Sequence, residues 1–184
     1  MTPSPIATIV AELERFGIPH MVAGSFASTL HGEPRTTQDI DLVIDPEWPS
    51  LRRFAHELDR SRFYVSEEAV REAWERRGQF NVVLLDSGWK VDLIIRKDRP
   101  FSRSEFERRQ PATIGDAQVL AATAEDTIVA KLEWASVGES ERQLRDVVGI
   151  LGLSGDRLDR GYIERWVREL GLQELWTRVQ GEAS

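Results

Sequence analysis

The stretch Met21–Ile44, MVAGSFASTLHGEPRTTQDIDLVI, places two aspartates inside a short apolar run near its end. Side chains in a β-strand alternate between the two faces, so Asp39 and Asp41 are expected on one face, about 6.5 to 7 Å apart along the backbone. A divalent cation relieves the repulsion between two such carboxylates, and Mg²⁺ is usually held by one or two carboxylates together with substrate phosphates. The pair therefore predicts a binding site for a metal-bound triphosphate.

The same stretch contains a turn that suits a phosphate. Gly24 has no Cβ, so the backbone can turn sharply there and a phosphate can approach closely. Residues 25–30 are expected to form a short helix, and the first N–H groups of a helix lack intrahelical partners and favour an anion. The hydroxyl of Ser25 adds one donor. The alternative is a simple glycine turn followed by a strand with aspartates on its solvent face, although aspartate is depleted in strands.

Together these residues resemble a known family. Gly24-Ser25, thirteen intervening residues and Asp39-Ile40-Asp41 resemble the signature of the polymerase-beta-like nucleotidyltransferase superfamily. The segment 35–37, RTT, resembles more narrowly the AbiEii-type branch, the nucleotidyltransferase-like toxins of bacterial abortive-infection and toxin-antitoxin pairs. The resemblance implies an α/β (α+β) fold, with a small mixed β-sheet flanked by helices and a C-terminal helical appendage.

A third acid lies inside the apolar run 89–95. Asp92 follows Val91 and precedes Leu93, and a carboxylate buried in such a strand must be paired or bind a metal. Asp92 also matches the third carboxylate that the superfamily carries on a neighbouring strand. An edge-strand aspartate that faces water is the alternative. The resemblance implies that Asp92 completes the shell of a second Mg²⁺ ion and takes the proton of the acceptor hydroxyl, while Asp39 and Asp41 bind both ions.

Other residues enter through the resemblance alone. The segment 125–132, EDTIVAKL, followed by Arg142–Asp146, resembles the helical motif that follows the core in AbiEii-type proteins. By that resemblance Lys131 reaches the nucleotide phosphates with Gly24 and Ser25, and Asp146 supports Lys131 or an arginine. A lysine with a buried stem and an ordinary Arg–Asp surface pair are the alternatives. Arg35 is expected to balance charge near the phosphates. Thr36, Thr37 and Gln38 lie in the same connection, and the alternative for them is a role only in the turn.

The periodicity of apolar residues predicts the elements around these motifs. Helices are expected over residues 6–16, 25–30, 47–61, 67–77, 123–136 and 140–151, with one or two short helices over 158–179. Strands are expected over 20–23, 39–44, 63–65, 80–85 and 89–95. Residues 96–109, rich in arginine, are expected to be a solvated loop, and 111–122 irregular chain with a short strand. The predicted domains are an α/β core over 1–122 and a helical region over 123–184.

Composition narrows the function classes. The chain of 184 residues has a net charge of −7, which argues against generic coating of nucleic acid, and it contains no cysteine for a thiolate site or disulfide. Its three histidines show no metal-like spacing. It contains no apolar run long enough to cross a membrane and opens with no secretory pattern, so a cytoplasmic location is expected.

Three hypotheses therefore stand. The first is an Mg²⁺-dependent enzyme that moves a nucleoside monophosphate from an NTP to a hydroxyl of RNA, protein or a small molecule. The AbiEii-type resemblance implies for it the role of a toxin with a cognate antitoxin. The second is an inactive relative that binds a nucleotide or partner. The third, a glycosyltransferase that uses a nucleotide sugar, leaves the Gly24-Ser25 turn unexplained. An aminoglycoside acceptor would suit the acidic charge, and RNA would suit the basic segment 96–109.

Overall fold

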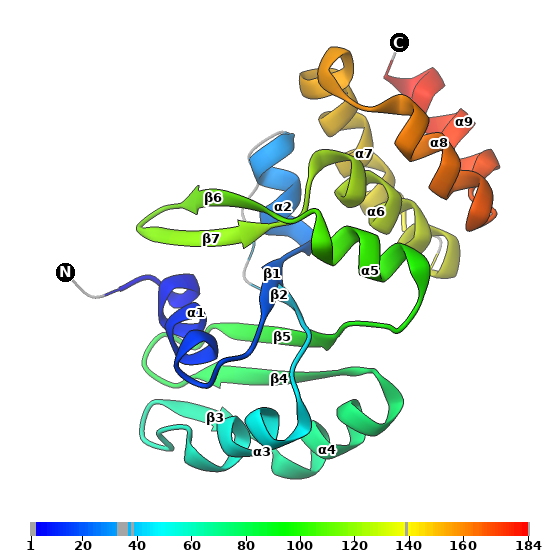
Figure 1. Cartoon of the computed structure of the whole chain (residues 1–184). Coiled ribbons are helices and arrows are strands. Elements are labelled where there is room, and N and C mark those ends of the chain that lie inside the picture. Colours follow the sequence, from blue (N-terminus) through cyan, green and yellow to red (C-terminus); the bar gives the residue numbers. More distant parts are fainter. Residues whose placement is uncertain (1–2, 33–36, 38, 139, 184) are drawn as a thin grey trace. The chain divides into compact units, whose positions relative to one another are not determined.

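The computed structural model describes residues 3–32, 37, 39–138 and 140–183 (Figure 1). The chain divides into two compact units: Met1–Ala23 with Thr37–Ala121, and Gly24–Thr36 with Ala122–Ser184. The sequence predicts a single boundary between residues 122 and 123. The structure also divides the chain near that position, and it further assigns the segment after the first strand to the C-terminal helices.

The first unit contains a mixed sheet, as the sequence predicts. Its strands, within the described residues, follow the order β3-β4-β5-β2-β1-β7-β6. Strands β2 and β5 are parallel, as are β1 and β7, whereas the other neighbours are antiparallel. The strands are β1 (His20–Val22), β2 (Asp39–Ile44), β3 (Phe63–Val65), β4 (Gln79–Leu84), β5 (Lys90–Ile95), β6 (Gln110–Ile114) and β7 (Ala117–Ala121).

Strands β2 and β5 each have one apolar and one partly polar face. Ile40, Leu42 and Ile44 of β2 are fully buried, and Val91, Leu93 and Ile95 of β5 are buried in the same alternation. The residues between them project to the other face, because side chains alternate along a strand. Burial of one face thus fixes which side of the sheet carries the aspartates.

Four helices of the first unit begin at recognisable signals. They are α1 (Pro5–Arg15), α3 (Trp48–Glu57), α4 (Glu67–Arg76) and α5 (Pro100–Glu107), within the described residues. The Ser4 hydroxyl accepts a hydrogen bond from the N–H of Ala7 at the start of α1, and Ser66 caps α4 in the same way. Both serines satisfy a backbone donor that the helix itself leaves unpaired. Helices α1 and α3 supply core residues such as Ile9, Leu13 and Phe54.

Two predictions for this unit are wrong. The basic segment is not all loop, because Pro100 occupies the first turn of α5 and its fixed φ suits that position. Residues 110–121 form a hairpin, in which β7 is the short strand that the sequence predicts and β6 replaces the expected irregular chain. Gly115 adopts φ +59° in the connecting turn, a conformation that glycine tolerates and other residues avoid.

The second unit is helical in its described part. Its helices are α2 (Gly24–His31), α6 (Ala124–Gly138), α7 (Glu141–Ser154), α8 (Arg160–Glu169) and α9 (Gln173–Glu182), with a short 3₁₀ turn, η1 (Gly155–Arg157). Ile128, Leu132, Val147 and Ile163 are buried at its centre. Trp134 is 56% exposed. Its position on α6 lies outside the apolar stripe that packs inward.

Close packing joins α2 and α7 within this unit. A Cβ added at Gly32 would lie 3.1 Å from the backbone nitrogen and the side chain of Ile150. The ring of His31 donates from Nε2 to the carbonyl of Ala122 at 2.8 Å, and the hydroxyl of Ser154 donates to the carbonyl of His31. Glycine at position 32 therefore permits the approach of the two helices. No helix in the described part of the chain is long and apolar enough to span a bilayer.

Candidate active site

The register of β2 and β5 brings the three predicted carboxylates to one side of the sheet. Asp41 is the direct partner of Asp92, and Asp39 is the direct partner of Lys90. Paired residues of neighbouring strands lie about 4.8 Å apart and project to the same face. The structure therefore confirms that Asp92 lies beside Asp41, on the face opposite the buried apolar residues.

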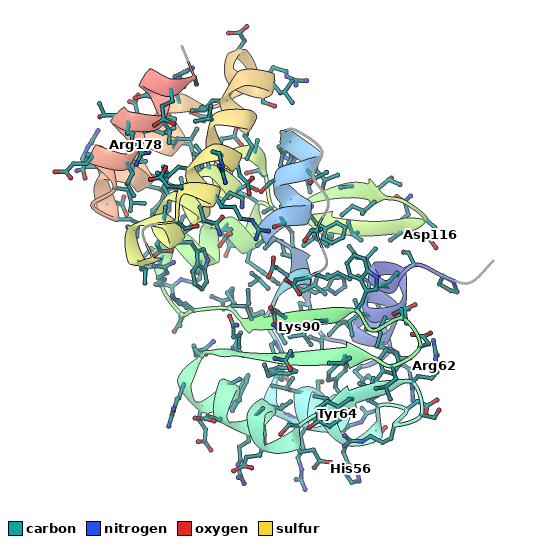
Figure 2. The ribbon with its side chains drawn as sticks, turned by 180° about the vertical axis from the view of Figure 1, so that it is seen from behind. His56, Arg62, Tyr64, Lys90, Asp116 and Arg178 are labelled. Atoms are coloured by element: carbon teal, nitrogen blue, oxygen red, sulfur yellow. The ribbon has the colours of Figure 1, made fainter. Side chains whose placement is uncertain are left out.

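Lys90 forms an ion pair with Asp92 inside this group. The ammonium Nζ lies 3.0 Å from Oδ1 and 3.1 Å from Oδ2, and only the contact with Oδ2 has hydrogen-bond geometry. The Lys90 side chain is 44% exposed and that of Asp92 13% exposed. Figure 2 shows Lys90 on its strand. We name Asp39, Asp41, Asp92 and Lys90 the acid cluster.

The carboxylates of the acid cluster shift the pKa of Lys90. The hydrogen bond to Asp92 is the largest effect and raises the pKa of Lys90; burial, the next largest, lowers it, and the charges of Asp92, Asp39 and Asp41 raise it further. All three carboxylates thus act on one ammonium. One positive charge against three negative charges leaves an excess of negative charge, and such a group attracts a cation.

One atom of the acid cluster suits a metal. Oδ1 of Asp92 is buried and makes no hydrogen bond among the described residues, although the Lys90 ammonium lies 3.0 Å from it as an ion-pair partner. Carboxylate oxygen is the ligand type that Mg²⁺ prefers. The donor set of Asp39, Asp41 and Asp92 therefore fits Mg²⁺ chemically. Among the described residues, however, no three His, Cys, Asp or Glu side chains lie close enough together to hold a metal ion as they stand.

The predicted phosphate turn begins the second unit. Gly24 is the first residue of α2 and adopts φ +56°. Glycine tolerates this backbone conformation and other residues avoid it, which agrees with the sharp turn predicted at this position. Helix α2 covers the predicted helical segment. The hydroxyls of Ser28 and Thr29 donate to the carbonyls of Gly24 and Ser25, at 2.9 and 3.0 Å. The role of Gly24 and Ser25 in phosphate binding stays a prediction.

Lys131 and Asp146 meet within the second unit, as expected from the resemblance. Lys131 Nζ donates to Oδ2 of Asp146 and to Oε1 of Gln143, each at 2.7 Å. The side chains of the lysine and the aspartate are 5% and 12% exposed. This pair links α6 to α7. The expected contact of Lys131 with phosphates stays a prediction, and Arg35 lies outside the described residues.

The sequence matches no protein-family model, and no curated protein matches it. Solved structures are similar to it over nearly their whole length. ANT(2")-Ia in complex with adenylyl-2"-tobramycin has a TM-score of 0.57 at 17% identity, over 92% of this chain and 96% of that one. The chain has the nucleotidyltransferase fold.

Two further structures have the same fold. An antigenic nucleotidyltransferase-like protein from Paracoccidioides brasiliensis gives a TM-score of 0.55 at 16% identity, over 95% of this chain and 90% of that one. The lincosamide antibiotic adenylyltransferase LnuA, bound to lincomycin, gives 0.52 at 11% identity, over 82% and 96%. At these identities the likeness concerns the nucleotidyltransferase fold.

Two residues beside the carboxylates were not predicted from the sequence. One is Lys90, and the other is Asn81, which pairs with Asp92 across β4 and β5 and projects to the same face. Lys90 was detectable, since it precedes Asp92 by two residues in the same predicted strand. Asn81 was not, because the register of β4 and β5 depends on their turn.

The basic segment is largely engaged in local contacts. Arg96 pairs with Asp45 at 2.9 Å, and Arg103 pairs with Asp98 at 2.5 Å. The guanidinium of Arg109 lies 4.1 Å from the centre of the Phe106 ring. The two ion pairs reduce the net positive charge that segment 96–109 offers to an RNA backbone.

Proposed function

We propose that this chain is a metal-dependent nucleotidyltransferase that moves a nucleoside monophosphate from an NTP to a hydroxyl group. The pairing of Asp41 with Asp92 across β2 and β5 carries the proposal, because it places two carboxylates side by side on a shared nucleotidyltransferase fold. Asp39 lies on the same face and completes the acidic group. Asp92 Oδ1, buried without a hydrogen-bond partner in the described chain, supports a role as a ligand or a base.

The chemistry assigns each residue a task. Asp39, Asp41 and Asp92 would hold Mg²⁺, which when bound supplies positive charge for the attacking and leaving oxygens of an in-line displacement. Asp92 accepts the proton of the acceptor hydroxyl as its oxygen bonds to the α-phosphorus. The bond from the α-phosphorus to the bridging oxygen breaks, and pyrophosphate leaves. Gly24, Ser25 and Lys131 are the proposed triphosphate ligands, with Arg35 as a further candidate.

A small molecule is the acceptor that we propose. The names of two similar structures include tobramycin and lincomycin, and these structures match almost the whole of their own length. The net charge of −7 suits a cationic small molecule better than RNA. A toxin role with an RNA or protein acceptor and a cognate antitoxin, implied by the AbiEii-type resemblance, is the alternative. In either case we expect the protein to act in the cytoplasm, where its NTP substrate is available.

The test is transfer of label from each α-³²P-labelled NTP in the presence of Mg²⁺. Three acceptor pools are offered separately: a panel of aminoglycosides and lincosamides, total RNA, and a nucleic-acid-free protein extract. We expect label in the small-molecule pool and none with the double variant Asp39→Asn, Asp41→Asn. Label in RNA or protein would favour the toxin role. Equal labelling by the double variant, or no labelling of any pool, would contradict the proposed enzyme activity and favour a non-catalytic binding protein.

A further inference from the structure

Lys90 places a positive charge beside the three carboxylates of the acid cluster. Its ammonium lies within 3.1 Å of both carboxylate oxygens of Asp92 and beside the partner position of Asp39. A divalent cation bound by the same carboxylates would need the same oxygens. The ammonium and a metal ion therefore compete for the carboxylate oxygens of Asp92.

The lysine can leave this position at little cost. Its side chain is 44% exposed, so its charged end can turn into water without passing through the core. Lysine carries a compact ammonium on a flexible stem, unlike the rigid planar fork of arginine. Asp92, by contrast, is 13% exposed and held on a central strand. Exchange thus moves the lysine and leaves the carboxylate in place.

Three carboxylates close together repel one another, and an ammonium among them reduces the repulsion. A side chain that supplies this charge stabilises the strands before any metal arrives. A lysine also supplies only half the charge of a divalent ion.

We propose that Lys90 is an exchangeable counter-ion of Asp92, which it neutralises in the metal-free protein and releases when a divalent cation binds. The proposal rests on the proposed function, because it assumes that the acid cluster binds a metal. Lys90 acts through Asp92 and is a positioning residue. Its release frees an ammonium beside the bound metal, on the same face as Asp39.

The variant Lys90→Met tests the competition. Methionine keeps an unbranched side chain but removes the charge, so the nucleotide-free protein should bind Mn²⁺ about three- to tenfold more tightly, as expected for loss of one competing ion pair. Free Mn²⁺ is measured by electron paramagnetic resonance. Lys97→Met is the matched control, because Lys97 is exposed in the same unit and carries the same charge. Lys90→Arg keeps the positive charge and should therefore bind Mn²⁺ as weakly as the wild type.

A second measurement uses the unaltered protein. The chain has three lysines, Lys90, Lys97 and Lys131, so ¹³Cε-labelled lysine gives three assignable signals. Addition of Mg²⁺ should shift the Lys90 signal and leave the Lys97 signal unchanged. This readout does not depend on the folding of any variant.

The outcomes separate the two proposals. Suppose that the wild type binds Mn²⁺ and transfers label, but that Lys90→Met binds Mn²⁺ no more tightly and the Lys90 signal does not move. The proposal that Lys90 is a counter-ion is then wrong, and the proposed enzyme activity is unaffected. If Lys97→Met tightens Mn²⁺ binding as much as Lys90→Met, the cause is the lower positive charge of the whole protein, and the proposal that Lys90 is a counter-ion is again wrong. If no variant binds Mn²⁺ and no acceptor is labelled, both proposals fall.

Discussion

Asp41 and Asp92 are direct partners in the parallel pair of β2 and β5, although fifty other residues separate them in the sequence. Because paired residues project to the same face, the sheet itself brings the two carboxylates together. No loop has to fold over to complete the pair. The candidate chemistry therefore rests on two strands whose opposite face is buried in the core of the first unit.

Asp92→Asn should lower kcat/KM for nucleotidyl transfer at least about a hundredfold, because loss of one metal contact removes several kcal/mol of transition-state stabilisation. The folded state should not suffer, since the variant removes a negative charge from a crowded group. Steady-state transfer assays and thermal melting measure the two effects. Asp86→Asn, in the exposed turn after β4, is the control. Equal loss in both variants would contradict the role of Asp92.

Asp146→Ala should destabilise the second unit by about 2 to 4 kcal/mol, because it leaves a buried ammonium without its carboxylate. Lys131 is 5% exposed, so water replaces the lost partner poorly. Urea denaturation measures the change, with Arg145→Ala on the exposed face of α7 as the control. The double variant Lys131→Met, Asp146→Leu should recover part of the loss. A double variant as unstable as Asp146→Ala would show that the charge is not the cause.

Gly32→Ala should cost about 1 to 3 kcal/mol, since the new methyl group would lie 3.1 Å from backbone and side-chain atoms of Ile150. Gly152→Ala, on α7 with no atom within 4 Å of its added Cβ, is the matched control. It should stabilise the helix by up to about 1 kcal/mol. Urea denaturation of both variants gives the comparison, and a neutral Gly32→Ala would contradict the close packing of α2 on α7.

The pair of Glu141 and Arg178 should make stability depend on pH. The guanidinium donates to both carboxylate oxygens, at 3.0 and 2.7 Å, and this hydrogen bonding lowers the pKa of Glu141 from its usual 4.5. A lowered folded-state pKa means that the contribution is present above the unfolded-state value and is lost as the pH falls through the folded-state value.

Melting temperatures from about pH 7 to about pH 3 check this dependence, with Glu141→Gln as the reference. The wild type should melt higher than the variant at neutral pH, and the two curves should converge in acid. A constant difference across the range would show that Glu141 does not titrate in the contact.

Local signals predicted much of the first unit. The strand 39–44 and the helix over 67–76 have their expected places, because alternation of apolar residues and the Ser66 cap act over a few neighbouring residues. The position of Asp92 on the face that carries Asp41 has an equally local origin. It follows from period-two alternation in two strands that both bury one apolar side.

Long-range pairing was harder to predict. Residues 110–121 have few β-branched residues, and their hairpin depends on a turn at Gly115. The assignment of Gly24–Thr36 to the C-terminal helices depends on contacts of α2 with segments more than ninety residues away, such as His31 with Ala122. Lys90 was overlooked because a lysine at a strand start is ordinary until its neighbours across the sheet are known.

The acid cluster can be examined by anomalous diffraction from crystals grown with Mn²⁺ and a non-hydrolysable NTP analogue. We expect a Mn²⁺ peak within about 2.0 to 2.3 Å of carboxylate oxygens of both Asp41 and Asp92, with the triphosphate on the same ion. The Lys90 ammonium should have left Asp92. Mn²⁺ bound elsewhere, or nucleotide bound while Lys90 still pairs with Asp92, would contradict the proposed active site.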